Sequence, residues 1–207
     1  NTIIKSFEYG IYLQSASKNI ISGNSIANCS HALGLFSSSN TSILGNSITN
    51  NTDCFWFTSS PYNTLQGNAM SGNKYSFYFT GFELDEFMQS IDVSNMIDGK
   101  PVYYFVNQTD LLINLSTFPQ VGFLGLVNSE NISVEGLTLT DSWQGILLAY
   151  TRNSRIENNS FRSNYHGVWL FSSSGNSFSF NNITNNQVGA YLDKSFNNTF
   201  SRNRIAD

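Results

Sequence analysis

The sequence of 207 residues is short of charge, of helix-forming residues and of long apolar runs. Charged residues make up 12%, about half of the usual share. Alanine occurs 7 times and glutamate 6 times, so residues that favour helices are scarce and a helical fold is excluded. No apolar run reaches the roughly 18 residues of a membrane span. The net charge of −4 argues against a nucleic-acid partner.

Uncharged polar residues dominate instead, with 28 asparagines and 31 serines beside 14% aromatic residues. Asparagine and serine favour turns, whereas aromatic and β-branched residues favour strands. Enough apolar side chains are spread through the chain to build a core, so disorder is excluded. The length suits one large domain or two small ones, and the composition predicts an all-β fold.

The chain begins at Asn1 without an initiator methionine or a signal peptide, which indicates a processed product or a piece of a longer protein. Cys29 and Cys54 would allow one disulfide, and their spacing neither requires nor excludes it. Nine asparagines satisfy the N-x-[S/T] rule for glycosylation of secreted proteins. These acceptor candidates are Asn28, Asn40, Asn50, Asn107, Asn114, Asn131, Asn158, Asn182 and Asn197. We expect a secreted or cell-surface glycoprotein.

Large apolar residues recur at intervals of 22 residues in both halves of the chain. The frame runs through Leu13, Ile21, Ile26, Leu35, Ile43, Ile48, Phe57, Leu65 and Met70, and later through Leu126, Val134, Leu139, Leu148, Ile156, Phe161, Leu170, Phe178, Ile183, Leu192, Phe200 and Ile205. Shifts of about 26 and 21 residues keep the middle in phase. These shifts place Met96 in the column of Met70. They also imply a short insertion around 81–90.

A repeat of 22 residues is too short for a pair of helices and about half of a propeller blade. It suits three short strands wound once around a solenoid. The segments GIYL, GVWL and GAYL alternate in the way that strands do. We therefore predict an all-β, single-stranded right-handed parallel β-helix of about nine coils, forming one domain over 1–207.

Asparagine occupies one column of this frame. The column contains Asn24, Asn46, Asn68, Leu137, Asn159, Asn181 and Asn203. Equivalent residues of neighbouring coils should lie about 4.8 Å apart. Asparagine tolerates the left-handed geometry of turns, and its amide can donate to a carbonyl one coil away. We predict that these asparagines stabilise the scaffold.

The repeat with its N-x-I-x-x-N pattern resembles the parallel β-helix repeats of the NosD-like, carbohydrate-binding and sugar-hydrolase group. DGKPVYYFVNQTDLLI (Asp98–Ile113) and GLVNSENISVEGLTLTDSWQGILLAYTRNSRIENNSF (Gly125–Phe161) resemble NosD-like surface proteins common in archaea. The resemblance covers essentially the whole chain and implies the β-helix fold, which does not fix a function. The calcium-binding aspartates of pectate lyases and the aspartate cluster of polygalacturonases have no match here.

The NosD resemblance also implies copper handling, which requires clustered imidazole or sulfur ligands. The candidate ligands are His31, His166, Cys29, Cys54, Met70, Met88 and Met96. They form no C-x-x-C, H-x-H or methionine cluster, so we predict no metal site and no cofactor.

An aromatic column is the best functional signal. The outward positions of the first strand are Tyr12, Gly34, Trp56, Tyr78, Tyr104, Gly125, Leu147, Trp169 and Tyr191. Flat rings stack on sugar rings, so we expect polysaccharide binding by Trp56, Tyr78, Tyr104, Trp169 and Tyr191, with any groove near the insertion. Cross-strand stacking that only stiffens the sheet and contact with another protein are alternatives.

Two pairs of side chains are candidates for catalysis. Glu135 and Glu157 share a column, and neighbouring coils have a spacing close to that of a retaining glycosidase pair. The alternative is two solvated glutamates. His31 shares a column with Asp53, with Glu8 nearby, and a histidine beside a carboxylate can act as a general base. The alternative is a surface hydrogen bond at a turn.

The frame already runs at residue 1 and still runs at the last residues, where capped ends would be expected. We expect either a longer parent protein or self-association through open solenoid ends, which would build filaments. The sequence predicts a surface module with a structural or adhesive role that binds polysaccharide. A polysaccharide-degrading enzyme, either a glycoside hydrolase or a lyase, and a sheath or filament subunit are the alternatives.

Overall fold

The computed structural model describes residues 1–206, which form two compact units, 1–103 and 104–206. Both units consist almost wholly of strands, as the scarcity of helix formers predicts. The division falls within strand β14 (Lys100–Val106). The single domain over 1–207 stays a prediction.

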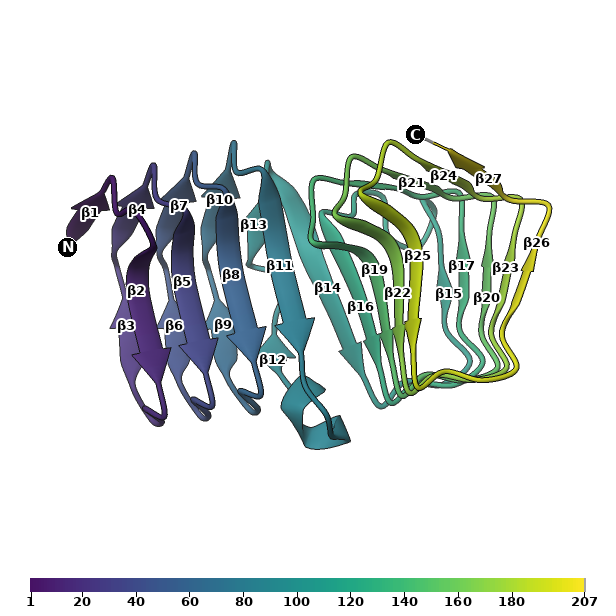
Figure 1. The fold of residues 1–207 in the computed structure, drawn as a ribbon, viewed down its shortest axis with the longest axis horizontal. Helices are drawn as coiled ribbons and strands as arrows, with labels where there is room; N and C mark the ends of the chain where they lie inside the picture. The colour runs from purple at the N-terminus through teal and green to yellow at the C-terminus, as the bar shows by residue number, and fades with distance from the viewer. Residues whose placement is uncertain (207) are drawn as a thin grey trace. The chain divides into compact units, whose positions relative to one another are not determined.

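In the first unit, strands of successive turns pair side by side and in parallel (Figure 1). The long strands are β2 (Tyr9–Gln14), β5 (His31–Phe36), β8 (Asp53–Thr58) and β11 (Tyr75–Thr80). A second sheet contains β3 (Ile20–Ser22), β6 (Ser42–Leu44), β9 (Thr64–Gln66) and β12 (Ser90–Ile91). The remaining strands are β1 (Thr2–Ile4), β4 (Ser25–Ala27), β7 (Ser47–Thr49), β10 (Ala69–Ser71) and β13 (Met96–Ile97).

Neighbouring turns are in register at the predicted interval. Leu13 pairs with Leu35, Leu35 with Phe57, and Phe57 with Phe79. The rings of Phe57 and Phe79 stack with their centroids 5.1 Å apart. Each fully buried side chain of this size contributes about 1.5–3 kcal/mol, so the interior columns supply most of the stability of the coil.

The predicted asparagine ladder is confirmed. The backbone N–H and the side-chain amide of Asn24 both donate to Oδ1 of Asn46, at 2.9 and 3.0 Å. The amide of Asn46 donates to the carbonyl of Ile21, and Asn68 repeats the pattern one turn further. The left-handed conformation was assigned to the wrong residue, however. It belongs to the preceding position, as at Gly23 (φ 61°), because the ladder asparagine itself points into the core.

The insertion contains a short 3-10 helix, η1 (Leu84–Phe87), whose Phe87 is buried. Beyond it, Leu65 pairs with Ile91 as predicted, but Met70 pairs with Ile97. The placement of Met96 in the core column is therefore wrong. The turn between β12 and β13 holds one residue more than the frame assumed, so Met96 pairs with Ala69 instead.

A tight hairpin follows β13 and reverses the chain direction. Ile97 pairs with Lys100 in antiparallel fashion. The two residues between them, Asp98 and Gly99, have φ of 47° and 78°. Two consecutive positive φ values are typical of a type I′ turn, for which Asp-Gly is a favoured sequence. The uninterrupted parallel frame predicted through this region is therefore wrong at the hairpin.

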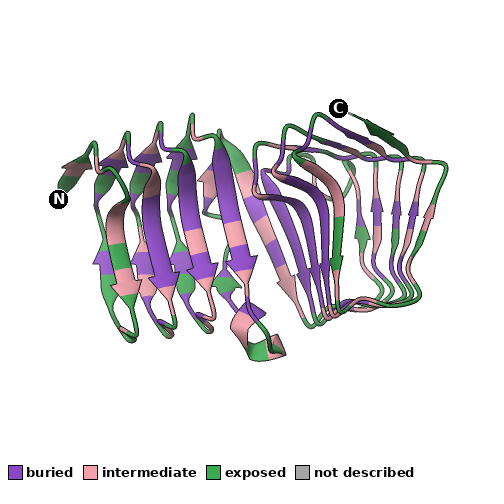
Figure 2. Cartoon of the chain, in the orientation of Figure 1, coloured by how far each residue is buried: buried purple, intermediate pink, exposed green. Residues whose placement is uncertain are grey.

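The second unit repeats the three-strand turn. Its long strands after β14 are β16 (Phe123–Val127), β19 (Gln144–Ala149), β22 (His166–Phe171) and β25 (Val188–Asp193). The others are β15 (Leu112–Ile113), β17 (Ser133–Glu135), β20 (Arg155–Glu157), β23 (Ser177–Ser179), β26 (Thr199–Ser201), β18 (Thr138–Thr140), β21 (Ser160–Arg162), β24 (Asn182–Thr184) and β27 (Arg204–Ala206). Figure 2 shows that β16, β19 and β22 are buried along their whole length.

One interior column of the second unit tests the predicted stacking directly. Ile156 pairs with Phe178 and Phe178 with Phe200. The two phenylalanine rings are nearly parallel, with their centroids 4.6 Å apart. The prediction of a parallel β-helix of about nine turns is confirmed.

Candidate functional site

The outer face of the sheet formed by β2, β5, β8 and β11 carries aligned columns of side chains. We call six of them the aromatic face: Tyr9, Tyr12, His31, Phe36, Trp56 and Tyr78. Tyr12, Phe36, Trp56 and Tyr78 follow the alternation of the strands, because the residues between them point into the core. Tyr9 and His31 do not follow it, and a local interruption of the strand explains their position.

The interruption lies at the second residue of each long strand. A Cβ added to Gly10 would lie 2.6 Å from Cγ2 of Ile26, so position 10 faces the interior. Ile11 beside it pairs with Leu33, which is fully buried. Two consecutive inward residues displace the alternation by one position. The preceding residues, among them Tyr9 and His31, are thereby turned to the outer face.

His31 contacts the carboxylate of Asp53 on the next turn. His31 Nδ1 lies 2.5 Å from Asp53 Oδ2, and the two side chains are 23% and 2% exposed. The predicted column of these two residues is confirmed, but the contact joins strands β5 and β8 and is not a surface bond at a turn. A buried carboxylate needs a polar partner, and this contact fixes the plane of the imidazole ring.

Aromatic rings enclose this imidazole. Tyr9 stacks on His31 with ring centroids 4.7 Å apart, and Trp56 meets it edge-on at 5.1 Å. Tyr78 packs against Trp56 with centroids 4.6 Å apart. Part of each ring surface is therefore used in cross-strand stacking, which is the alternative to polysaccharide binding for the aromatic column.

A surface pocket of about 560 Å³ opens beside these rings. It is lined by Ser6, Glu8, Tyr9, Tyr12 and Phe36. Tyr12 is 47% exposed, so part of this residue meets solvent. Burial and the nearby carboxylates of Glu8 and Asp53 raise the pKa of Tyr9. The pocket therefore combines apolar ring faces with negative charge, and it is not lined by the insertion, where a groove was expected.

The second unit does not continue the exposed strip. Tyr104 and Trp169 are 7% and 4% exposed, whereas Tyr191 is 42% exposed. The expectation that Tyr104 and Trp169 face solvent is wrong. A Cβ on Gly125 would lie 2.7 Å from the Tyr104 ring, so this tyrosine lies over the glycine. Trp169 is packed against His166 and Tyr191.

His166 is the centre of this second aromatic cluster. Its ring contacts Tyr165, Trp169 and Tyr191 at centroid distances of 4.9, 4.9 and 5.1 Å. It pairs in register with Gln144 rather than with a carboxylate. Burial lowers the pKa of His166, and a hydrogen bond with the backbone of Trp143 opposes that shift.

The carboxylates of Glu135 and Glu157 lie on neighbouring turns, as their predicted column requires. Each has a polar partner. Asn114 Nδ2 donates to Glu135 at 3.1 Å, and Arg155 pairs with Glu157 at 2.7 Å. These contacts are those of a stabilised pair of surface glutamates, and catalysis by them stays a prediction.

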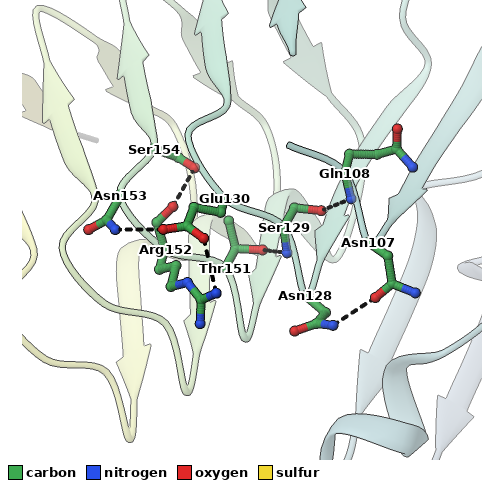
Figure 3. Close-up of polar contacts among 9 residues, drawn as sticks. All are labelled: Asn107, Gln108, Asn128, Ser129, Glu130, Thr151, Arg152, Asn153 and Ser154. Atoms are coloured by element: carbon green, nitrogen blue, oxygen red, sulfur yellow. Dashed lines mark hydrogen bonds and ion pairs between the residues drawn. The ribbon is translucent and has the colours of Figure 1, made fainter. Parts of the chain in front are cut away.

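A corner of the second unit carries three separate groups of polar contacts (Figure 3). Arg152 pairs with Glu130 at 3.0 Å, and Asn153 donates to the same carboxylate. Asn128 donates to Asn107 at 2.7 Å.

Most of the glycosylation candidates lie at positions where the backbone is left-handed, with positive φ. These seven of the nine are Asn28, Asn40, Asn50, Asn107, Asn131, Asn158 and Asn197. Asn114 and Asn182 do not lie at such positions, and modification of any of the nine stays a prediction.

The side chains that would bind copper are dispersed. Within residues 1–206, no three His, Cys, Asp or Glu side chains are grouped so that they could hold a metal ion. Cys29 and Cys54 are buried free thiols, which answers the question of their pairing. Burial and the charge of Asp53 raise the pKa of the Cys54 thiol, and Met70 is a core residue. This donor set does not fit a copper site.

Two residues of the site were missed from the sequence. Tyr9 was overlooked because strict alternation places it in the core, although it precedes His31 by the repeat length. Phe36 lies two residues after Gly34, on the same outer face. The small residues Gly10 and Ala32 indicate the interruption in the sequence, since only small side chains fit where two consecutive residues both point inward. The interruption in turn places Tyr9 on the outer face.

A family model described as "Periplasmic copper-binding protein (NosD)" matches residues 1–89 and again residues 89–207. The two matches together span the chain. No curated protein matches the chain at a significant level. Within residues 1–206, no helical segment has the length and apolar character of a membrane crossing.

Proposed function

The chain belongs to the NosD family, and from this premise we propose that it is a polysaccharide-binding module whose site is the aromatic face. The family is described as periplasmic, which fits an extracellular or envelope location. The β-helix supplies a rigid support, but the fold itself leaves the function open. The argument for a glycan therefore depends on the side chains of the face.

The pocket beside Tyr9, Tyr12 and Phe36 is the observation that carries this proposal. Ring faces that meet solvent can stack on the C–H faces of a sugar. The rings of Tyr12 and Phe36 pack together with their centroids 5.2 Å apart, and the Tyr12 hydroxyl donates to Gln14. These contacts hold the Tyr12 ring in place before a ligand arrives, which lowers the entropic cost of binding.

The half-buried rings of Trp56 and Tyr78 extend the face along the sheet. Turns of a β-solenoid repeat about every 4.8 Å, close to the length of one sugar residue. Neighbouring rings would therefore meet successive units of a chain. In the second unit only Tyr191 of the predicted strip is exposed, so we place the site on the first unit.

Copper binding, which the description of the family includes, has no support in the donor set of this chain. The two thiols are buried, and the two histidines belong to separate aromatic clusters. We therefore derive no role for copper here.

A glycan array followed by calorimetric titration tests the proposal. Tyr12→Ala should weaken binding by about 1–3 kcal/mol, by analogy with aromatic stacking on other ring ligands. Tyr62→Ala is the matched control, because Tyr62 is also 47% exposed but lies outside the site. Equal affinities of both variants and the native protein would remove the aromatic face from the site.

The His31–Asp53 contact favours a second candidate, a polysaccharide-degrading enzyme with His31 as general base. Binding without turnover in a reducing-sugar or lyase assay supports the binding module. Turnover that His31→Gln abolishes, while Tyr62→Ala retains it, would establish the enzyme.

A further inference from the structure

We propose that the pocket beside Tyr9 and Tyr12 selects glycans that carry free amino groups over N-acetylated and uronic-acid glycans. This inference rests on the proposed function and names the class of sugar. It follows from the charge and the ring geometry of the pocket.

The lining combines one carboxylate with three aromatic rings. Glu8 contributes the carboxylate, and Ser6 contributes a hydroxyl that donates to the backbone carbonyl of Tyr9. None of the lining residues carries a positive charge. Within residues 1–206, no lysine, arginine or histidine forms an ion pair with Glu8, so its charge is available to a ligand.

The three rings lie at angles to one another. Tyr9 and Phe36 are nearly perpendicular, at 84° and 5.9 Å, and Tyr12 is tilted by about 40° from both. Ring faces attract cations, and ammonium groups are often held by several rings. An ammonium that lies over these faces and beside Glu8 would be bound by both effects.

The neighbouring His31–Asp53 pair does not reverse this charge. The pair carries one negative charge when the imidazole is neutral and none when it is protonated. Together with Glu8, the site is therefore negative in either state. The rise in the pKa of Tyr9, caused after burial by Glu8 and then by Tyr12 and Asp53, reflects the same negative surroundings.

An amino sugar satisfies both parts of the pocket. Its ring can stack on Tyr12 while its ammonium reaches Glu8. A uronic acid would bring its carboxylate against Glu8, and an N-acetyl group would replace the charge by a neutral amide. A lysine side chain offers the charge without the ring, so it would use only half of the site.

Four probes of equal length test the inference by calorimetry at low salt: glucosamine oligomers, N-acetylglucosamine oligomers, oligogalacturonate and oligolysine. The pH is kept below the pKa of the sugar amine. We expect the amino sugar to bind about five- to ten-fold more tightly than the acetylated oligomer, on the strength of exposed cation–π and ion-pair contacts. The preference should shrink as salt is added.

Glu8→Gln should reduce the ratio of the two affinities to about two-fold or less, since only the ring contacts remain. Asp141→Asn is the matched control, because it removes one exposed carboxylate from the other unit. That variant should keep the native ratio.

The outcomes separate the two proposals. Equal affinity for both oligomers, with both weakened by Tyr12→Ala, would overturn the amine preference and keep the glycan site. Failure of every sugar to bind would overturn the glycan site itself. Oligolysine binding as tight as that of the amino sugar would show that charge alone is recognised, which also overturns the inference.

Discussion

The ring of Tyr9 occupies the space that a side chain at position 34 would fill. A Cβ added to Gly34 would lie 2.6 Å from Tyr9 Cε1 and 3.0 Å from the ring of Phe36. The second unit repeats this arrangement with Tyr104 and Gly125. In both units, a glycine on the outer face therefore leaves room for the ring of a tyrosine from the preceding turn.

Gly34→Ala should displace the Tyr9 ring and disturb the pocket. We expect a loss of about 1–2 kcal/mol of stability, as for other overpacked sites, together with weaker glycan binding. Gly125→Ala is the matched control, since it should cost similar stability under Tyr104. Denaturant unfolding and calorimetric titration measure the two effects. Equal loss of glycan affinity in both variants would contradict the placement of the site on the first unit.

Asp53→Asn should destabilise the first unit by about 1–3 kcal/mol, because a neutral amide would replace the buried carboxylate that contacts His31 Nδ1. Urea unfolding measures the loss. Asp141→Asn changes an exposed carboxylate and should stay within about 0.5 kcal/mol of the native protein. An unchanged stability of Asp53→Asn would show that the contact contributes little.

Asn46→Ala should be more costly than removal of an exposed asparagine. It leaves the backbone N–H and the side-chain amide of Asn24 without their acceptor in the core. Unpaired buried groups cost about 1–3 kcal/mol each. Asn19→Ala, at an exposed position that bonds only to the backbone of its own turn, is the control. Thermal unfolding that ranks the two variants equally would contradict the ladder as a source of stability.

The repeat predicted the fold because each interior column is a run of large apolar residues at a fixed interval. The pairing of Ile21 with Ile43 and of Val134 with Ile156 follows directly from that interval. The repeat does not predict the hairpin at Asp98–Gly99, although Asp-Gly is a strong turn signal, because a fixed interval implies one continuous frame. Local turn chemistry there outweighs the repeat.

The candidate site was only partly visible in the sequence. His31 and Asp53 were found because equal spacing puts them in one column. The exposure of Tyr104 and Trp169 was not predictable from alternation, since alternation gives the direction of a side chain and not what lies over it. The pocket depends on Tyr9, whose outward position requires the interruption at Gly10.

His166 should make the second unit less stable at acid pH. Burial lowers its pKa below the ordinary value of 6.5. As the pH falls through that value, the unfolded chain binds a proton before the folded one does, so the free energy of unfolding decreases. The decrease is complete once the pH is below the pKa of the folded state. Hydrogen exchange of β19 and β22 at a series of pH values measures this loss.

His166→Gln removes the titrating group, and the Gln144 paired with it shows that glutamine is accepted in this column. The variant should therefore lose less protection in β19 and β22 between about pH 7.5 and pH 5 than the native protein does. His31→Gln provides the comparison, because it removes a histidine from the first unit and should leave the pH dependence of the second unit unchanged. If the native protein and His166→Gln have the same pH profile in these strands, the protonation of His166 is not coupled to the packing of its aromatic cluster.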